Sequence, residues 1–180
     1  MPRLVAFLRA INVGGHTVKM DVLRRQFQAL GLAQVETFIA SGNVIFTSAS
    51  RNTAGLEQKI AARLRAALGY EVATFIRLPG ELAAIAEYQP FPPAAYQAAQ
   101  AFNVAFLGRP PEAEAGRRLA ALRSDIDEFA WQGREVYWLC RKKQSESTFS
   151  NAVLERALGQ PATMRGISTL KKLAARLAAR

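Results

Sequence analysis

Residues 3–9 read Arg-Leu-Val-Ala-Phe-Leu-Arg, and five consecutive apolar side chains between two arginines predict a short buried β-strand. A glycine-rich break follows at 12–15, and apolar residues then recur at helical spacing from Met20 to Leu30. The rest of the first half predicts two strands, a helix and a last strand, at residues 35–40, 44–47, 56–68 and 72–78. This order of elements is typical of the split βαβ, ferredoxin-like fold.

The second half of the chain predicts the same order of elements. Strands are expected at 102–107, 126–131, 135–140 and 161–164, with helices at 112–123 and 149–158. A further C-terminal helix contains Leu170, Leu173 and Leu177. We see no sequence repeat between the two halves, so their similarity lies in the order of elements alone.

The strongest break in the chain is Gln89-Pro-Phe-Pro-Pro93, which marks a boundary. We therefore predict an α+β protein with two ferredoxin-like subdomains (alpha-beta plaits), each an antiparallel sheet with helices on one face. The N-terminal subdomain spans 1–79, a connecting helix and Pro-rich linker span 80–100, and the C-terminal subdomain with an extra basic helix spans 101–180.

The strands at 4–8 and 44–46 are apolar on both faces, because they show no alternation of polar and apolar residues. Helices are expected to cover one face of this sheet. The other face is then expected to meet the second half, a partner subunit or a ligand.

Cysteine and histidine usage excludes several classes of site. The chain has one cysteine, Cys140, and one histidine, His16, which excludes a disulfide framework and a zinc site built from these residues. No metal or other cofactor is expected. A lone cysteine at the end of an apolar strand is expected to be buried and inert, and it favours a reducing compartment. With neither a targeting signal nor an apolar membrane segment, the chain is expected to be cytoplasmic.

The net charge of +10 is unevenly distributed along the chain. Residues 1–140 have 15 basic and 12 acidic side chains, whereas residues 141–180 have 9 basic and 2 acidic. The 18 Arg against 6 Lys, beside 33 Ala, are also what a GC-rich genome produces without selection for binding. A contact with nucleic acid is therefore expected to centre on the last forty residues, if the charge is functional.

Three motifs in order resemble those of a known family. They are Arg9-x-Ile11-Asn12-Val13-Gly14-Gly15 with Lys19-Met20-x-x-Leu23, Ser41-Gly42-Asn43-Val44-x-Phe46, and Thr163-x-Arg165-x-x-x-Thr169-x-x-Lys172-Leu173. Together they are similar to the bacterial family of uncharacterised proteins called domain of unknown function 1697. The resemblance implies paired ferredoxin-like subdomains and no particular activity. This chain departs from the pattern at Ala10, where Gly is usual, and at Met164 and Gly166, where Thr and Asn are usual.

Each motif is also a candidate ligand-binding site. A strand-to-helix loop with free backbone N–H groups and a lysine is suited to a phosphate, although paired glycines also serve simply as turns. The Gly42-Asn43 pair suits the turn of a tight hairpin. The alternative is that Ser41 and Asn43 form part of a ligand site at the end of the sheet. A helix start with an arginine and hydroxyls suits an anion, or is a cap with a solvated face. The candidate residues are Arg9, Asn12, Gly14, Gly15, Lys19, Ser41, Asn43, Arg165, Thr169 and Lys172.

Three classes of function follow from these residues. The first is a binding protein for an anionic ligand, either a nucleic acid backbone or a phosphorylated small molecule. The second is a small metal-independent enzyme acting on a phosphorylated or carboxylate substrate. The third is a structural or interaction protein. The sequence favours the first class, because it offers anion-binding groups without a nucleophile–base pair.

Overall fold

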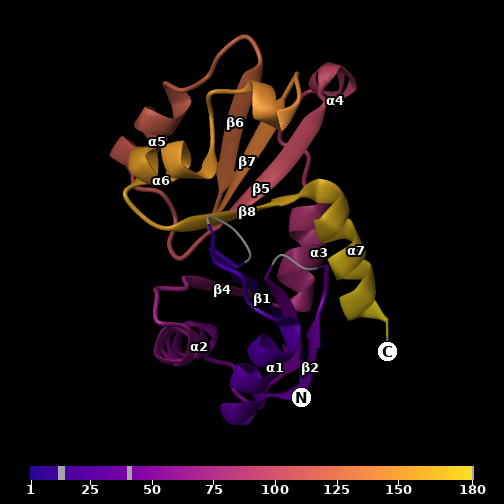
Figure 1. Ribbon diagram of the computed structural model, residues 1–180. Helices are drawn as coiled ribbons and strands as arrows, with labels where there is room; N and C mark the ends of the chain where they lie inside the picture. The colour runs from indigo at the N-terminus through magenta and orange to yellow at the C-terminus, as the bar shows by residue number, and fades with distance from the viewer. Residues whose placement is uncertain (12–14, 40–41, 180) are drawn as a thin grey trace. The chain divides into compact units, whose positions relative to one another are not determined.

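The computed structural model describes residues 1–11, 15–39 and 42–179 and divides them into two compact units (Figure 1). Unit 1 comprises Met1–Ala84 and Lys171–Arg180, and unit 2 comprises Ile85–Leu170. Each unit contains one four-stranded antiparallel sheet. Among the described residues, none of the helices combines the length and the apolar character needed to span a bilayer.

Unit 1 is built on the sheet order β2-β3-β1-β4. Its elements are β1 (Arg3–Leu8), α1 (Met20–Ala29), β2 (Ala33–Thr37), β3 (Asn43–Thr47), α2 (Thr53–Leu68) and β4 (Thr74–Arg77). Helix α3 (Pro79–Glu87) begins in this unit, and the last turns of α7 (Ile167–Ala178) belong to it.

Unit 2 has the equivalent sheet order, β6-β7-β5-β8. Its elements are α4 (Pro93–Ala98), β5 (Ala101–Leu107), α5 (Ala113–Ala120), β6 (Asp127–Gln132), β7 (Glu135–Cys140), the short 3₁₀ helix η1 (Gln144–Glu146), α6 (Asn151–Leu158) and β8 (Ala162–Gly166). Two similar halves, each a split βαβ arrangement, confirm the predicted α+β, ferredoxin-like fold.

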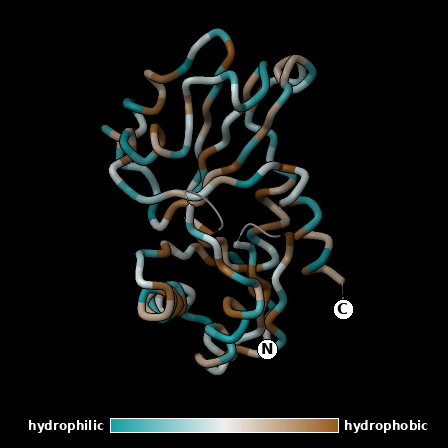
Figure 2. The backbone as a smooth tube through the Cα atoms, in the orientation of Figure 1, coloured by the Kyte–Doolittle hydropathy of each residue, from teal (hydrophilic) through white to brown (hydrophobic). Residues whose placement is uncertain are grey.

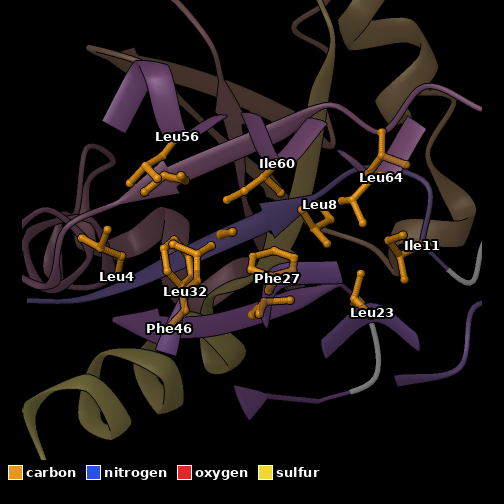
Figure 3. Packing of buried hydrophobic residues seen from close by; sticks show 14 of the residues in the cluster. Leu4, Leu8, Ile11, Leu23, Phe27, Leu32, Phe46, Leu56, Ile60 and Leu64 are labelled. Carbon is orange, nitrogen blue, oxygen red and sulfur yellow. The ribbon is translucent and has the colours of Figure 1, made fainter. Parts of the chain in front are cut away.

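The main core of unit 1 lies between the sheet and helices α1 and α2. Leu4 and Leu8 of β1 face Phe27 of α1 and Ile60 of α2, and all four are buried (Figure 3). Hydrophobic residues follow the central strands, as the brown segments of Figure 2 show. Burying large apolar side chains of this kind contributes roughly 1.5–3 kcal/mol for each, which makes this face the principal source of stability.

The apolar centre of the opposite face of the unit 1 sheet is also buried, as the sequence predicts. Val5 and Phe7 are fully buried there, and Arg3 and Glu36 lie on the same face. The Arg3 guanidinium donates to the carbonyl groups of Arg176 (3.0 Å) and Ala179 (2.9 Å). Glu36 accepts a hydrogen bond from Arg176 at 3.0 Å. This clamp fastens the end of α7 to the sheet of unit 1.

The second face of the unit 2 sheet is covered by aromatic side chains from the Pro-rich segment. Phe102 on β5 packs against Tyr96 (ring centroids 5.4 Å apart) and Phe91 (6.3 Å). Tyr88 packs edge-on against Tyr137 of β7 at 5.0 Å. The Pro-rich segment therefore connects the two units and also covers part of the sheet of unit 2.

The units therefore differ from the predicted division at 80–100. The chain passes from unit 1 to unit 2 within α3, and the Pro-rich segment belongs to unit 2 through its aromatic contacts. The last ten residues group with unit 1, whereas the predicted C-terminal subdomain included them. The Arg3–Arg176 contact is the physical reason, because it fastens α7 to β1.

The strand registers reveal a short repeat, so the expectation that the halves share element order alone is wrong. The segment Val-Ala-Phe-Leu occurs at 5–8 in β1 and again at 104–107 in β5. Val5 lies opposite Arg77, and Val104 lies opposite Arg165. A related contact joins each sheet to the helix before its last strand. Glu57 of α2 accepts the backbone N–H of Ile76, and Glu155 of α6 accepts that of Ala162, two residues away from the equivalent register position.

Ala10 occupies the left-handed region of backbone conformation, with φ of 61°. An L-residue with a Cβ is strained there by about 1–2 kcal/mol, and a glycine would relieve this strain. We predict that Ala10→Gly raises the free energy of unfolding by about 0.5–1 kcal/mol, after the added flexibility of the unfolded chain is subtracted. Denaturant unfolding would measure the change, and a loss of stability would contradict it.

The connection before β3 differs from the tight hairpin that the sequence predicts. Strand β2 ends at Thr37 and Asn43 already belongs to β3, so the loop is longer than two residues. Gly42 has φ of 75°, and its carbonyl accepts a hydrogen bond from the Leu8 amide at 2.8 Å. A Cβ at Gly42 would lie 3.0 Å from the Leu8 carbonyl oxygen. Gly42 is therefore held by both its conformation and its close contact.

We predict that Gly42→Ala destabilises the protein more than Gly31→Ala does. Gly31 has a similar φ of 79°, but a Cβ there would meet no atom within 4 Å. Backbone strain alone costs about 1 kcal/mol at either position, and crowding at Gly42 adds about 1–3 kcal/mol. Equal losses in urea unfolding would show that the close contact is unimportant.

Candidate functional site

The loop that precedes α1 is the first predicted anion site, and Asn12 and Gly14 of it lie outside the described residues. Arg9 is half-buried, and its amide donates to the Ala73 carbonyl at 2.9 Å. Gly15 has φ of 83° and is exposed. Lys19 precedes α1, is exposed and makes no capping hydrogen bond with its side chain. Gly15 thus supports the turn interpretation, while Lys19 remains accessible to a ligand.

An aromatic contact beside this loop could not be found by sequence reasoning. The ring of His16 stacks on Tyr70 with centroids 3.8 Å apart, and the Tyr70 hydroxyl donates to the Ala10 carbonyl at 3.3 Å. Burial raises the pKa of Tyr70, so its hydroxyl keeps its proton at neutral pH. The two rings are far apart in sequence, and no spacing rule connects them.

The predicted hairpin site is largely structural. Ser41 lies outside the described residues, and Asn43 is only 1% exposed. The Asn43 side-chain amide donates to the carbonyl groups of Phe38 (3.1 Å) and Ile39 (3.3 Å). These bonds hold the loop between β2 and β3, as expected for an asparagine that replaces backbone hydrogen bonding in a turn.

Arg165 is the most unusual of the predicted site residues. It lies on β8, is 8% exposed, and its Nη1 donates to Thr163 Oγ1 and to the Met164 carbonyl, both at 2.7 Å. Burial lowers the pKa of Arg165 to about 10, so the guanidinium is still protonated at neutral pH. The two hydrogen bonds offset part of the desolvation cost of burying this positive charge.

Helix α7 starts two residues after Arg165 and has no acidic residue in its first turn. Ser168 is exposed and Thr169 is half-buried, and within residues 1–11, 15–39 and 42–179 neither hydroxyl has a hydrogen-bond partner. Lys172, in the next turn, is exposed and belongs to unit 1. Arg165 and Thr169 are thus the two predicted residues that the structure places at one corner of unit 2.

The equivalent corner of unit 1 has the negative charge that α7 lacks. Arg77 on β4 is fully buried, and α3 likewise starts two residues after it. Glu81 stands four residues after Arg77, as Thr169 stands four residues after Arg165, and its carboxylate accepts the Leu78 amide at 2.8 Å. A carboxylate here satisfies the positive end of the helix. In the second half, a hydroxyl replaces it.

Other polar groups in unit 2 serve packing. Asp127 is 3% exposed and accepts hydrogen bonds from Trp138 Nε1 (2.8 Å) and the Ser147 hydroxyl (2.7 Å).

In the described parts of the chain, histidine, cysteine and acidic side chains form no group that could hold a metal ion.

Cys140 is fully buried at the end of β7, as the sequence predicts. Burial raises the pKa of its thiol, and the charge of Asp127 raises it further. Since the thiolate is the reactive form, we predict negligible labelling of the native protein by a thiol reagent at pH 8, and one equivalent after unfolding. Rapid labelling of the native protein would show that Cys140 is accessible.

Comparison with known proteins agrees with this fold. The solved structure described as "conserved bacterial protein SP0830 from Streptococcus pneumoniae" is similar with a TM-score of 0.71 and 24% identity, over 98% of each chain. No curated protein matches the chain. A family profile with the description "Protein of unknown function (DUF1697)" matches residues 1–137. The match covers most of the sequence, so the chain belongs to the DUF1697 family of proteins of unknown function.

Proposed function

We propose that this protein binds a small anion, such as the phosphate group of a phosphorylated molecule, at the corner between β8 and α7. The observation that carries the proposal is the contrast between Glu81 and Thr169. The first half supplies its own carboxylate at the start of the helix, and the second half has a neutral hydroxyl at the equivalent position.

The chemistry of the corner suits an oxyanion. The start of α7 presents backbone N–H groups and partial positive charge, which favour an anion by about 0.3–1 kcal/mol at an exposed site. The hydroxyls of Ser168 and Thr169 are additional donors. The charged Arg165 on the preceding strand adds a positive field from a buried position. Phosphate, with several acceptor oxygens, uses such donors better than a single carboxylate does.

The same residues favour binding over catalysis. Ser168, Thr169 and Arg165 include no group that exchanges protons near neutral pH, and general acid–base catalysis needs one. An activity on a phosphorylated substrate is the second candidate function, and a base would then have to come from the substrate or from elsewhere in the chain.

Replacing Thr169 tests this proposal directly. We predict that Thr169→Glu restores the carboxylate found at Glu81, raises the melting temperature without ligand, and abolishes stabilisation by inorganic phosphate or pyrophosphate. The wild type should gain about 2.7 kcal/mol when the free ligand is at 100 times its dissociation constant. Thermal unfolding with increasing ligand measures both effects.

Thr169→Gln is the matched control, because it has the size of glutamate without the charge. The Gln side-chain amide can donate in place of the lost hydroxyl, so Thr169→Gln should keep most of the stabilisation by phosphate. The proposal is wrong if the wild type shows no saturable response to phosphate or pyrophosphate, or if the Glu and Gln variants respond equally.

A further inference from the structure

The positive charge of the protein belongs almost entirely to unit 1. This unit contains 14 of the 24 basic and 5 of the 14 acidic side chains, a net charge of +9, whereas unit 2 contains 10 and 9, a net charge of +1. A compositional preference for arginine would act on both units alike. Half of the asymmetry comes from the scarcity of acidic residues in unit 1, four fewer than in unit 2, and a preference for arginine does not explain that half.

All five carboxylates of unit 1 are engaged within the unit. Two contact arginines near them in sequence, Asp21 with Arg24 and Glu71 with Arg65. Glu36 lies between Arg3 and Arg176. The remaining two accept backbone amides, Glu57 from Ile76 and Glu81 from Leu78. These carboxylates are therefore already committed to contacts inside the unit.

Five cations without a carboxylate partner in the described structure lie on or beside α1 and α2. Both helices pack on the same face of the sheet, and Arg63 Nε joins them by donating to Gln26 Oε1 at 2.8 Å. All five are exposed, and we call them the α1–α2 face: Lys19, Arg25, Arg51, Lys59 and Arg63. Arg25 also borders a hollow of about 280 Å³ between α1 and β2.

We propose that the α1–α2 face binds nucleic acid through its phosphate backbone, without preference for base sequence. Exposed and unpaired cations on adjacent helices are suited to a row of phosphates. Phe7 and Phe46 on the central strands are fully buried, so the sheet offers neither for base stacking. The large exposed apolar residues that the structure describes, such as Ile39 and Trp131, lie outside α1 and α2, which favours a polyanion in water over insertion into a membrane.

This proposal is independent of the phosphate site at α7 and moves the expected contact away from residues 141–180. Of that segment, 141–170 has 5 basic and 2 acidic residues and belongs to unit 2, whose net charge is only +1. Lys171 and Lys172 belong to unit 1, but α7 is clamped to the opposite face of the sheet from α1 and α2. The two sets of cations are therefore separable by mutation.

The test is fluorescence anisotropy of the full chain with labelled duplex DNA of two unrelated sequences. Five phosphate contacts predict that affinity falls on the order of several hundredfold between about 50 and about 200 mM salt, equally for both sequences. In Lys59→Gln/Arg63→Gln, this loss should shrink to on the order of fortyfold, because the slope of log affinity against log salt falls by about two.

Arg109→Gln/Arg156→Gln is the matched control. It removes the same charge from unit 2, at exposed side chains that make neither ion pairs nor hydrogen bonds with the described residues. This control variant should leave the slope of log affinity against log salt at its wild-type value. The proposal fails if both double variants weaken binding equally, if the protein binds phosphatidylglycerol vesicles but not DNA, or if no DNA binds at low salt. Phosphate should stabilise Lys59→Gln/Arg63→Gln as much as it stabilises the wild type. A loss of DNA binding in this variant can therefore be distinguished from a loss of the phosphate site at α7.

Discussion

The central strands β1 and β5 are apolar on both faces, so both faces must be buried, and the architecture of each unit follows from this constraint. The segment Val-Ala-Phe-Leu in each strand places apolar side chains alternately on both sides of its sheet, so two covering layers are needed. The paired helices provide one layer in each unit, α1 with α2 and α5 with α6. The second layer is different in each unit. In unit 1 the end of α7 is hydrogen-bonded to this face through Arg3, and in unit 2 the aromatic residues of the Pro-rich segment pack on it.

Carboxylates help to close the exposed edges that these sheets leave. Strands β4 and β8 lie at the edges of their sheets, where unpaired backbone groups invite association with other strands. Glu57 of α2 and Glu155 of α6 each accept an amide from the adjacent edge strand. In unit 1, the Glu57 carboxylate is used in this way, and basic side chains determine the electrostatic character of the surface of α1 and α2.

Local sequence patterns were sufficient to predict the order of elements and the buried strands, because apolar runs and helical spacing depend on short-range information. Hydrophobic spacing identified the helix with Leu173 and Leu177, but it does not state which sheet a helix packs on. The packing of this helix depends on the hydrogen bond from Arg3 to the Arg176 carbonyl, and these two residues are 173 positions apart in the sequence. The repeat escaped detection because only four consecutive residues are identical, and their equivalence is visible only in the strand registers.

The candidate site shows the same division between local and distant information. Arg165 and Thr169 were predicted from their residue types at the start of a helix, but the significance of Thr169 depends on Glu81 in the other half. Asn43 was predicted to be either structural or functional, and its bonds to Phe38 and Ile39 were not available from the sequence. Residue type suggested an anion site in three places, and the structure adds which of their described residues are buried or already hydrogen-bonded.

The clamp formed by Arg3 also brings Arg3 and Ala179 together. Its guanidinium reaches the carbonyl of Ala179, so residues near the N-terminus and the C-terminus meet on the same face of one unit. Ends that lie so close can be joined by a short flexible peptide without strain on the strands between them. The architecture is thus suited to circular permutation, with new ends opened in an exposed loop such as the turn between β6 and β7.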